Sequence, residues 1–171
     1  MALALSLVFQ DEAVADVRAL WRALADAGIS RDMLDLDYPP HLTLVVADDD
    51  GLEDKMGLAL QAVERCPVTI RLGGVHRFDG TSVVWLACDG GEALMSLHAD
   101  IARQLPLQAI RSYYRPGQWT PHMTLQTTGD AEAASTLAGK LWQATPVLRA
   151  ARLELARFLP VQVLDGVALA D

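Results

Sequence analysis

The amino-acid sequence predicts an α+β fold made of a duplicated β-α-β-α-β unit, with two pseudo-symmetric lobes whose antiparallel sheets surround a central cleft. The phrase Pro-His-x-Thr-Leu occurs twice, at residues 40–44 and 121–125, an offset of 81 residues. Apolar residues also recur at this offset without gaps. They alternate in the expected strands and have helical spacing in the expected helices. We therefore interpret residues 1–171 as one bilobal domain, with repeat 1 at about 1–80 and repeat 2 at about 81–171.

The recurring apolar positions belong to one strand and two helices of each repeat. Leu3 and Leu5 correspond to Val84 and Leu86; Val14, Val17, Leu20 and Leu24 correspond to Met95, His98, Ile101 and Leu105; and Met56, Leu60 and Val63 correspond to Leu137, Leu141 and Ala144. After about residue 66 the registers drift apart, so the duplication is visible mainly in the first two-thirds of each repeat.

The expected elements follow from apolar periodicity and from helix and turn signals. Repeat 1 is expected to contain a strand at 2–9, a helix near 11–27, the first His strand at 41–46, a helix at about 52–65, and strands near 67–72 and 74–78. Repeat 2 is expected to contain a strand at 82–88, a helix at 91–105, the second His strand at 122–127, a helix at 130–143, and strands near 147–158 and 161–169. Asp11, Gly28 and Asp130 suit helix caps, and Asp50 with Glu53 has the spacing of a capping box.

The charge of the chain argues against long nucleic acids as partners. The net charge is −8, and residues 1–65 carry all of it, with 13 acidic and 5 basic side chains. Binding to a long polyanion depends on neutralising many phosphates, which an acidic protein does poorly. A small anion in a local basic cleft is compatible with this charge. The run Asp48-Asp49-Asp50 is interpreted as a solvated turn, because it lacks the pattern of a calcium loop.

The cysteine pattern and the lack of signal-peptide features at residues 1–9 predict a soluble protein in a reducing compartment. Cys66 and Cys88 have neither the spacing of metal ligands nor the number of a disulfide framework, and we expect buried thiols. Residues 1–9 lack the positive charge of a signal peptide and are too short to span a bilayer. We therefore expect a cytoplasmic protein without a membrane partner, and we favour a monomer.

The repeated phrase places a histidine and a threonine on one face of each expected strand. Side chains on a strand alternate between faces, so His41 and Thr43 point away from their apolar neighbours, and His122 and Thr124 do the same. A lone His-x-Thr is usually a structural polar pair. Two copies in matching frames of a duplication favour catalysis instead, because two imidazoles can supply a general base and a general acid near neutral pH.

These paired motifs resemble those of the two-histidine (2H) phosphoesterases, the superfamily of the LigT-like 2′-5′ RNA ligases and the 2′,3′-cyclic nucleotide phosphodiesterases. The resemblance covers essentially the whole chain. It implies the LigT-like fold, His41 and His122 as the catalytic histidines, and Thr43 and Thr124 as the phosphate-binding hydroxyls. It also implies that His41 is the acid and His122 the base during hydrolysis, although the residues themselves leave both roles open.

The expected activity is a metal-independent and cofactor-independent phosphodiesterase that hydrolyses a 2′,3′-cyclic phosphate, or a related cyclic or 2′-5′ phosphodiester, of a nucleotide or RNA end. Alternatives are a reversible 2′-5′ RNA ligase, a metal-dependent hydrolase and a non-catalytic module that binds a nucleotide or RNA end. The chain has no His-x-His or His-Glu-x-x-His pattern for a metal. RNA-ligase-like members often carry an arginine shortly after the second motif, whereas this chain continues Gln126-Thr127-Thr128. That difference weakens the ligase interpretation.

A segment without carboxylates, between Asp100 and Asp130, contains arginines and aromatic residues that could replace the missing arginine. We expect substrate contacts from Arg115, Tyr114 and Trp119, since such residues suit a phosphate and a stacked base. A solvated loop with its tyrosines packed on the core would explain the same residues. Four further residues are expected to have structural roles: His76, His98, Trp85 and Trp142.

Overall fold

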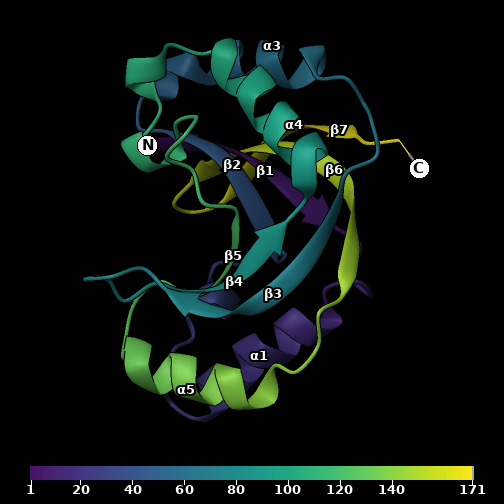
Figure 1. Cartoon of the computed structure of the whole chain (residues 1–171). Coiled ribbons are helices and arrows are strands. Elements are labelled where there is room, and N and C mark those ends of the chain that lie inside the picture. The colour runs from purple at the N-terminus through teal and green to yellow at the C-terminus, as the bar shows by residue number, and fades with distance from the viewer. Residues whose placement is uncertain (171) are drawn as a thin grey trace.

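The computed structural model describes residues 1–170, which form five helices and a single antiparallel sheet of seven strands (Figure 1). The strands are β1 Ala2–Phe9, β2 His41–Ala47, β3 Thr69–Arg77, β4 Val84–Asp89, β5 His122–Gln126, β6 Val147–Phe158 and β7 Gln162–Ala168. The helices are α1 Ala15–Asp26, α2 Asp32–Asp35, α3 Glu53–Ala62, α4 Gly91–Arg103 and α5 Ala131–Leu141.

The sheet closes on itself through its longest strand. The strand order is β1-β2-β5-β4-β3-β6-β7, and β6 also pairs with β1. Residues 147–149 of β6 pair with β3, and residues 150–158 pair with β1. The pairing of β6 with both β3 and β1 makes the sheet barrel-like. Every pairing is antiparallel, which confirms the predicted α+β class with antiparallel strands.

The two sides of the barrel each combine elements from both halves of the sequence. Helices α3 and α4 pack mainly on β1, β2, β6 and β7, whereas α1 and α5 pack on β3, β4 and β5 (Figure 1). Helix α4, from the second half, therefore covers the first His strand, and α1, from the first half, covers the second His strand. Each side of the barrel therefore contains elements of both sequence repeats.

The register of the sheet relates the two His strands to each other. β2 pairs with β5 through Leu42 and Met123, which are the positions matched by the 81-residue offset. Each His strand also has an irregularity at the same place against its outer neighbour, between Leu5 and Ser6 in β1 and between Val84 and Trp85 in β4. These matching features support a duplication.

The same register corrects one detail of the gap-free alignment. Ser6 lies opposite Thr43 and Trp85 lies opposite Thr124, so β1 and β4 correspond at an offset of 85 − 6 = 79. The first strand is therefore shifted by two residues from the offset of the motifs. Because a shift of two keeps the alternation of faces, the apolar pattern alone could not reveal it.

Several element boundaries differ from the prediction. Helix α1 starts at Ala15, and Asp11 does not cap it but pairs with Arg18 at 2.8 Å. The expected capping box is absent, because the side chain of Asp49 instead accepts a hydrogen bond from Gly51 N at a short 3₁₀ turn before α3.

The strands expected at 67–72 and 74–78 form the single strand β3, with a bulge between Leu72 and Val75. Two caps were predicted correctly: Asp130 accepts hydrogen bonds from Glu132 N and Ala133 N, and Gly28 follows α1 with a positive φ of 69°.

The apolar residues of the two motifs belong to the core, as the alternation predicts: Leu42 and Leu44 are fully buried, and so is Met123. The expectation of buried cysteines is correct for Cys88 and wrong for Cys66, whose side chain is exposed. Trp85, Trp142 and His98 are buried and His76 is exposed, in agreement with their structural interpretation. No helix among residues 1–170 is long and apolar enough to cross a membrane.

Candidate active site

The two His-x-Thr segments meet where β2 and β5 pair. Residues on either side of the Leu42–Met123 pair are half-buried and share one face of the sheet. Antiparallel pairing places His41 across from Thr124, and Thr43 across from His122. The two histidines are then diagonal neighbours, a relation for which the usual separation is about 7–8 Å. The four side chains therefore form a compact group in which each histidine has a threonine across the strand pair.

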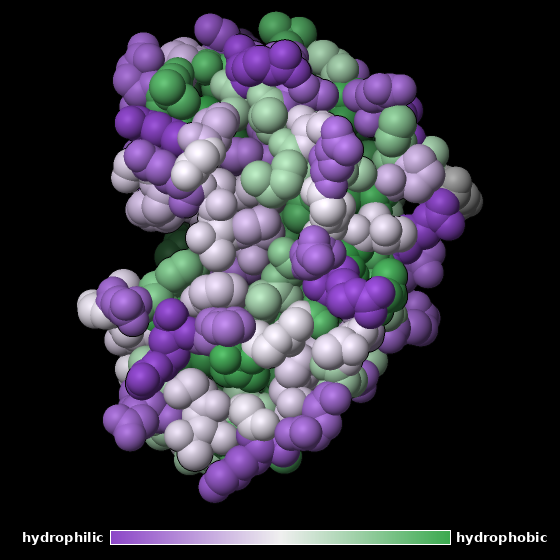
Figure 2. Space-filling view, viewed as in Figure 1, coloured by the Kyte–Doolittle hydropathy of each residue, from purple (hydrophilic) through white to green (hydrophobic). Residues whose placement is uncertain are grey.

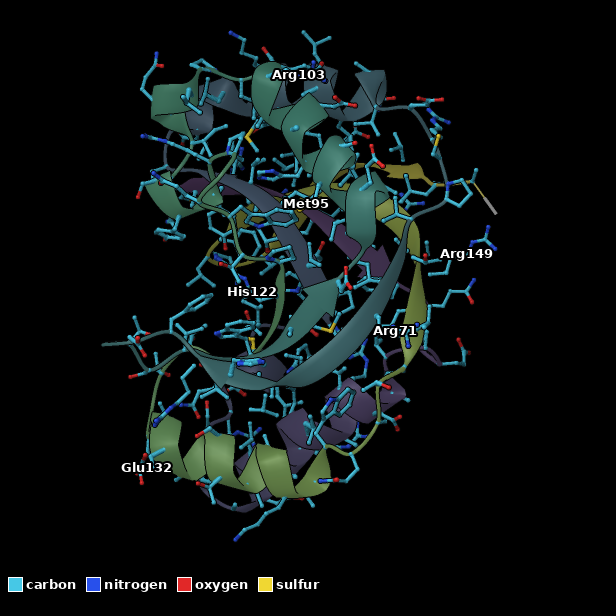
Figure 3. The ribbon with its side chains drawn as sticks, in the orientation of Figure 1. Arg71, Met95, Arg103, His122, Glu132 and Arg149 are labelled. Carbon is cyan, nitrogen blue, oxygen red and sulfur yellow. The ribbon has the colours of Figure 1, made fainter. Side chains whose placement is uncertain are left out.

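Two adjoining cavities open on this face. One, here called the His122 cavity, has a volume of about 630 Å³ and is lined by His122 together with Phe78, Tyr113 and other residues. The other, the His41 cavity, has a volume of about 450 Å³ and is lined by His41 and Thr43 together with apolar side chains. Three residues line both cavities: Tyr114, Thr124 and Thr127. The space-filling view shows a hollow on this side of the molecule (Figure 2), and His122 lies beside it (Figure 3).

Both histidines are held by a backbone carbonyl two residues earlier in the chain. The Nδ1 atom of His41 lies 2.8 Å from Pro39 O, and that of His122 lies 2.7 Å from Thr120 O. A carbonyl oxygen only accepts, so Nδ1 carries the proton in each ring. The Nε2 atom of each neutral imidazole is then the free basic nitrogen, which is the state that proton transfer requires.

Burial lowers the pKa of both imidazoles. Desolvation, together with the charge of nearby His122, lowers the pKa of His41 to about 4, although the hydrogen bond to Pro39 opposes the shift. Desolvation also lowers the pKa of His122, against the opposing hydrogen bond to Thr120. Both rings are therefore neutral at pH 7 in the free protein. A bound phosphate anion would favour the protonated forms and raise both pKa values.

The two threonine hydroxyls have different surroundings. Thr43 Oγ1 accepts a hydrogen bond from Ser6 Oγ at 3.3 Å and lies near the Tyr114 hydroxyl. For Thr124 Oγ1, no hydrogen bond is present within residues 1–170, and its side chain lines both cavities. Thr124 is thus the hydroxyl whose hydrogen-bonding capacity is free for a ligand.

Two tryptophan indole N–H groups donate hydrogen bonds to backbone carbonyls of the motif strands. Trp21 Nε1 donates to Thr124 O and Trp119 Nε1 donates to Thr43 O, both at 3.1 Å. The Trp119 ring is buried and stacks on His98 with ring centroids 4.1 Å apart. The structure therefore places Trp119 behind the first motif and not in either cavity, where sequence analysis expected a substrate contact.

The loop before the second motif places its other expected contacts differently. Tyr114 lines both cavities, whereas Arg115 lines neither. The Arg115 guanidinium instead donates to Ile110 O at 2.9 Å and to Gln108 O at 3.3 Å, within its own loop. Arg111 is the arginine of this loop that reaches the His41 cavity. Sequence analysis named Arg115 and not Arg111, because an irregular loop has no periodicity that would indicate which side chains face inward.

Tyr38, three residues before His41, was not singled out from the sequence. The Tyr38 ring packs edge-on against His41, with centroids 4.9 Å apart, and its hydroxyl donates to Glu154 Oε2 at 2.9 Å. A signal existed, because Tyr38 and Trp119 are aromatic residues three positions before their respective histidines, at the same 81-residue offset.

Asp32 holds the segment that follows the second motif. Its Oδ2 accepts hydrogen bonds from Thr127 N and Thr127 Oγ1, both at 2.6 Å, and from Thr128 N at 2.9 Å. Burial opposes ionisation of Asp32, but these bonds and one from Ser30 lower its pKa overall. The segment where RNA-ligase-like proteins often have an arginine is therefore tied to a carboxylate from α2.

Among residues 1–170, no group of three His, Cys, Asp or Glu side chains is arranged to hold a metal ion. Two imidazoles with their Nδ1 atoms fixed and their Nε2 atoms free, beside threonine hydroxyls, are able to transfer protons. A closed antiparallel sheet that brings two His-x-Thr strands to one cleft is the arrangement of the two-histidine phosphoesterases.

Comparison with known proteins supports this class. Residues 9–159 match the 2′-5′ RNA ligase superfamily. The chain therefore belongs to that superfamily. No curated protein matches the chain.

Solved structures share the fold at low sequence identity. LigT of E. coli in complex with 3′-AMP superposes with a TM-score of 0.68 and 19% identity, over 99% of this chain and 98% of that chain. TT0787 of Thermus thermophilus has a TM-score of 0.61 and 20% identity, over 99% and 98%. Usb1 of Kluyveromyces marxianus has a TM-score of 0.53 and 16% identity, over 98% of both chains. At these identities the likeness concerns the fold.

Proposed function

We propose that this protein is a metal-independent phosphodiesterase that opens a 2′,3′-cyclic phosphate of a nucleotide or short RNA end. The observation that carries the proposal is the pair of matched imidazoles, each with Nδ1 fixed by a backbone carbonyl and Nε2 available, beside Thr43 and Thr124. A related cyclic or 2′-5′ phosphodiester would meet the same groups. LigT structures with 3′-AMP, ATP and NADP⁺ support a small nucleotide ligand for the class.

In the proposed reaction, one imidazole takes a proton from water, the water oxygen attacks phosphorus, and the P–O bond to one ribose oxygen breaks. The second imidazole donates a proton to that leaving oxygen, and the product is a ribose phosphate monoester. Thr124 and Thr43 would donate hydrogen bonds to the non-bridging oxygens as negative charge develops on them. Proton exchange with solvent then returns both imidazoles to their starting states for the next cycle.

The assignment of acid and base follows from burial. The pKa of His41 is lowered further than that of His122, so a singly protonated pair carries its proton mainly on His122. We therefore propose His41 as the base and His122 as the acid. This order is the reverse of the one that the family resemblance implies.

The His122 cavity suits a nucleobase. Phe78 and Tyr113 offer aromatic faces there, and polar side chains such as Gln118 and Thr120 can pair with base edges. No Lys or Arg side chain among residues 1–170 lines this cavity. This composition favours hydrolysis of a small substrate over the joining of two long RNA ends.

The test is a phosphorus NMR panel of cyclic phosphates. It should contain 2′,3′-cyclic nucleotides, an ADP-ribose cyclic phosphate and a 2′-5′ dinucleotide, each with and without EDTA. We expect a monoester product from a 2′,3′-cyclic nucleotide and no effect of EDTA. Loss of turnover in EDTA would favour a metal-dependent hydrolase. Tight binding without turnover would favour a binding module, and a joined product from tRNA halves would favour a ligase.

Substitution of either histidine provides the largest expected effect. His41→Ala and His122→Ala should each lower kcat by about 10²–10⁴-fold, because each removes one proton-transfer group. His76→Gln is the matched control, since His76 is exposed and lines neither cavity. A folded His41→Ala or His122→Ala protein with the wild-type rate would contradict the proposal.

A further inference from the structure

The lining of the two cavities contains a single cation and no carboxylate among the described residues. That cation is Arg111, in the His41 cavity. The protein as a whole carries a net charge of −8, so its surface repels anions. The guanidinium is paired with the carboxylate of Asp48, which does not line the cavity, so an anion in the cavity would be held by the N–H donors that this pair leaves unused.

Arg111 lies toward the far end of β2 from the histidine. Its backbone N–H donates to Val46 O at 2.9 Å, three residues beyond Thr43 along the strand. Three residues of strand span about 10 Å. The guanidinium is drawn further in the same direction by Asp48, which follows β2. Arg111 is thus directed away from the position of the phosphate that would react between the histidines.

The contacts of Arg111 fix the guanidinium and leave two of its N–H donors without a partner in the described chain. Nε donates to both oxygens of Asp48 at 3.0 Å, Nη2 donates to Asp48 Oδ1 at 2.5 Å, and Nη1 donates to the Tyr113 hydroxyl at 3.4 Å. A guanidinium has five N–H donors. One N–H on Nη1 and one on Nη2 therefore remain without a partner among residues 1–170. Such charged donors can bind phosphate oxygens.

The cavity surface between Thr43 and Arg111 is apolar. Val46 and its strand partner Ala4 line the cavity there. An apolar surface suits the carbon face of a ribose, and it offers no hydrogen bonds to a phosphate. The order along the cavity is therefore a reacting-phosphate position, an apolar stretch for the ribose and a cation, while the base would occupy the His122 cavity.

We propose that Arg111 binds a second phosphate of the substrate, so that the preferred substrate is a nucleoside with a phosphate at both ends. A 2′,3′-cyclic nucleotide that also carries a 5′-phosphate, as at the end of an RNA fragment, has this form. The inference rests on the proposed cyclic phosphodiesterase function and names its substrate class. It also explains how a chain without an arginine after its second motif can select a charged substrate.

The first experiment compares kcat/KM for adenosine 2′,3′-cyclic phosphate with and without a 5′-phosphate. The wild-type protein should prefer the 5′-phosphorylated compound by about 10–100-fold, the range expected for hydrogen bonds to a charged group. Arg111→Gln should reduce this ratio to about one, mainly through KM of the 5′-phosphorylated compound. Because the readout is a ratio within one protein, partial unfolding of the variant cancels.

The matched control is Arg149→Gln, which removes the same charge. Arg149 is exposed on β6, and Figure 3 shows it on the opposite side of the molecule from His122. This control should keep the wild-type ratio. A wild-type ratio near one, or an unchanged ratio in Arg111→Gln, would overturn the inference while leaving cyclic phosphate hydrolysis intact.

A binding experiment separates this inference from the proposed reaction. Calorimetry with adenosine 3′,5′-bisphosphate and adenosine 3′-phosphate should give a preference for the bisphosphate that Arg111→Gln removes and Arg149→Gln retains. If the wild type hydrolyses neither cyclic compound but shows this preference, the proposed reaction fails and the assignment of Arg111 stands. If the two compounds bind equally, the assignment of Arg111 is overturned.

Discussion

The His41 side and the His122 side of the cleft have the same motif and different walls. Each histidine is fixed through Nδ1 by the carbonyl two residues earlier, and each threonine carbonyl accepts an indole N–H. Around this common frame the His41 cavity is apolar with one arginine, and the His122 cavity is aromatic and polar. Under the proposed function, the duplicated frame serves proton transfer, which needs a base and an acid, and the unlike walls bind the two unlike ends of a substrate.

The threonines offer the sharpest test of this difference. Thr43 is already engaged with Ser6, whereas the Thr124 hydroxyl has no partner within the described chain and lines both cavities. Thr124→Val should therefore lower kcat by about 10–100-fold, the cost of one hydrogen bond to developing charge. Thr43→Val should lower it by less than about tenfold. Steady-state rates on a 2′,3′-cyclic nucleotide measure both.

Thr136→Val, on the exposed face of α5, controls for the loss of a hydroxyl. Equal losses of kcat in Thr43→Val and Thr124→Val would mean that the two hydroxyls serve the reaction alike and that the difference in their surroundings has no catalytic consequence.

The pH dependence tests the unequal burial of the histidines. Both pKa values lie below the ordinary 6.5, and that of His41 is about 4. A histidine with a lowered pKa is neutral above that pKa, so kcat/KM should fall at low pH as His41 gains a proton and at higher pH as His122 loses one. The optimum of kcat/KM should lie below pH 6.5, with a decrease of about tenfold per pH unit well above it. The optimum of kcat should lie higher, because bound phosphate raises both pKa values.

The residual activity of His122→Ala then assigns the roles. If His41 is the base, this activity should rise with pH through a single pKa and remain constant above it; that pKa should lie above the value in the wild type, because the variant lacks the His122 charge that helps to lower it. A residual activity that instead falls as pH rises through this pKa would identify His41 as the acid, as the family resemblance implies, and would contradict the assignment made from burial.

Sequence analysis anticipated the parts of this molecule that depend on periodicity. Alternation along 41–46 and 122–127 gave the faces of the motif residues, and the repeat gave the pairing of their strands. Contacts between irregular segments could not be anticipated in this way. Trp119 was expected in the cleft, yet its indole is used to hold Thr43 O. Arg115 and Arg111 are alike in sequence, and only the path of the loop decides that Arg111 reaches a cavity. The two-residue shift of β1 relative to β4 was also not predicted, since it leaves every side chain on the same face of its strand.

The smallest expected effect concerns the residues after each motif, where the two sides differ most in backbone. β2 continues to Ala47, whereas β5 ends at Gln126 and its continuation is held by Asp32. Gly129, at a positive φ of 110°, brings this loop so close to the first half that a Cβ there would lie 2.9 Å from Ile29 O. Asp32→Ala should therefore lower the free energy of unfolding by about 1–3 kcal/mol at pH 7, because it leaves several N–H and O–H donors without an acceptor.

The sign of the pH dependence identifies the cause of that loss. The pKa of Asp32 is lowered in the folded protein, so its stabilising effect is present above its ordinary pKa of 3.8 and is lost as pH falls through the folded-state pKa. The difference between wild type and Asp32→Ala in urea unfolding should accordingly shrink below about pH 4. Asp35→Ala is the control, since Asp35 is on the same short helix in an exposed pair with Arg31 and should cost less than about 1 kcal/mol. A difference that is independent of pH would show that Asp32 stabilises the loop by packing and not as a carboxylate. The segment after the second motif would then not depend on an ionised side chain from α2.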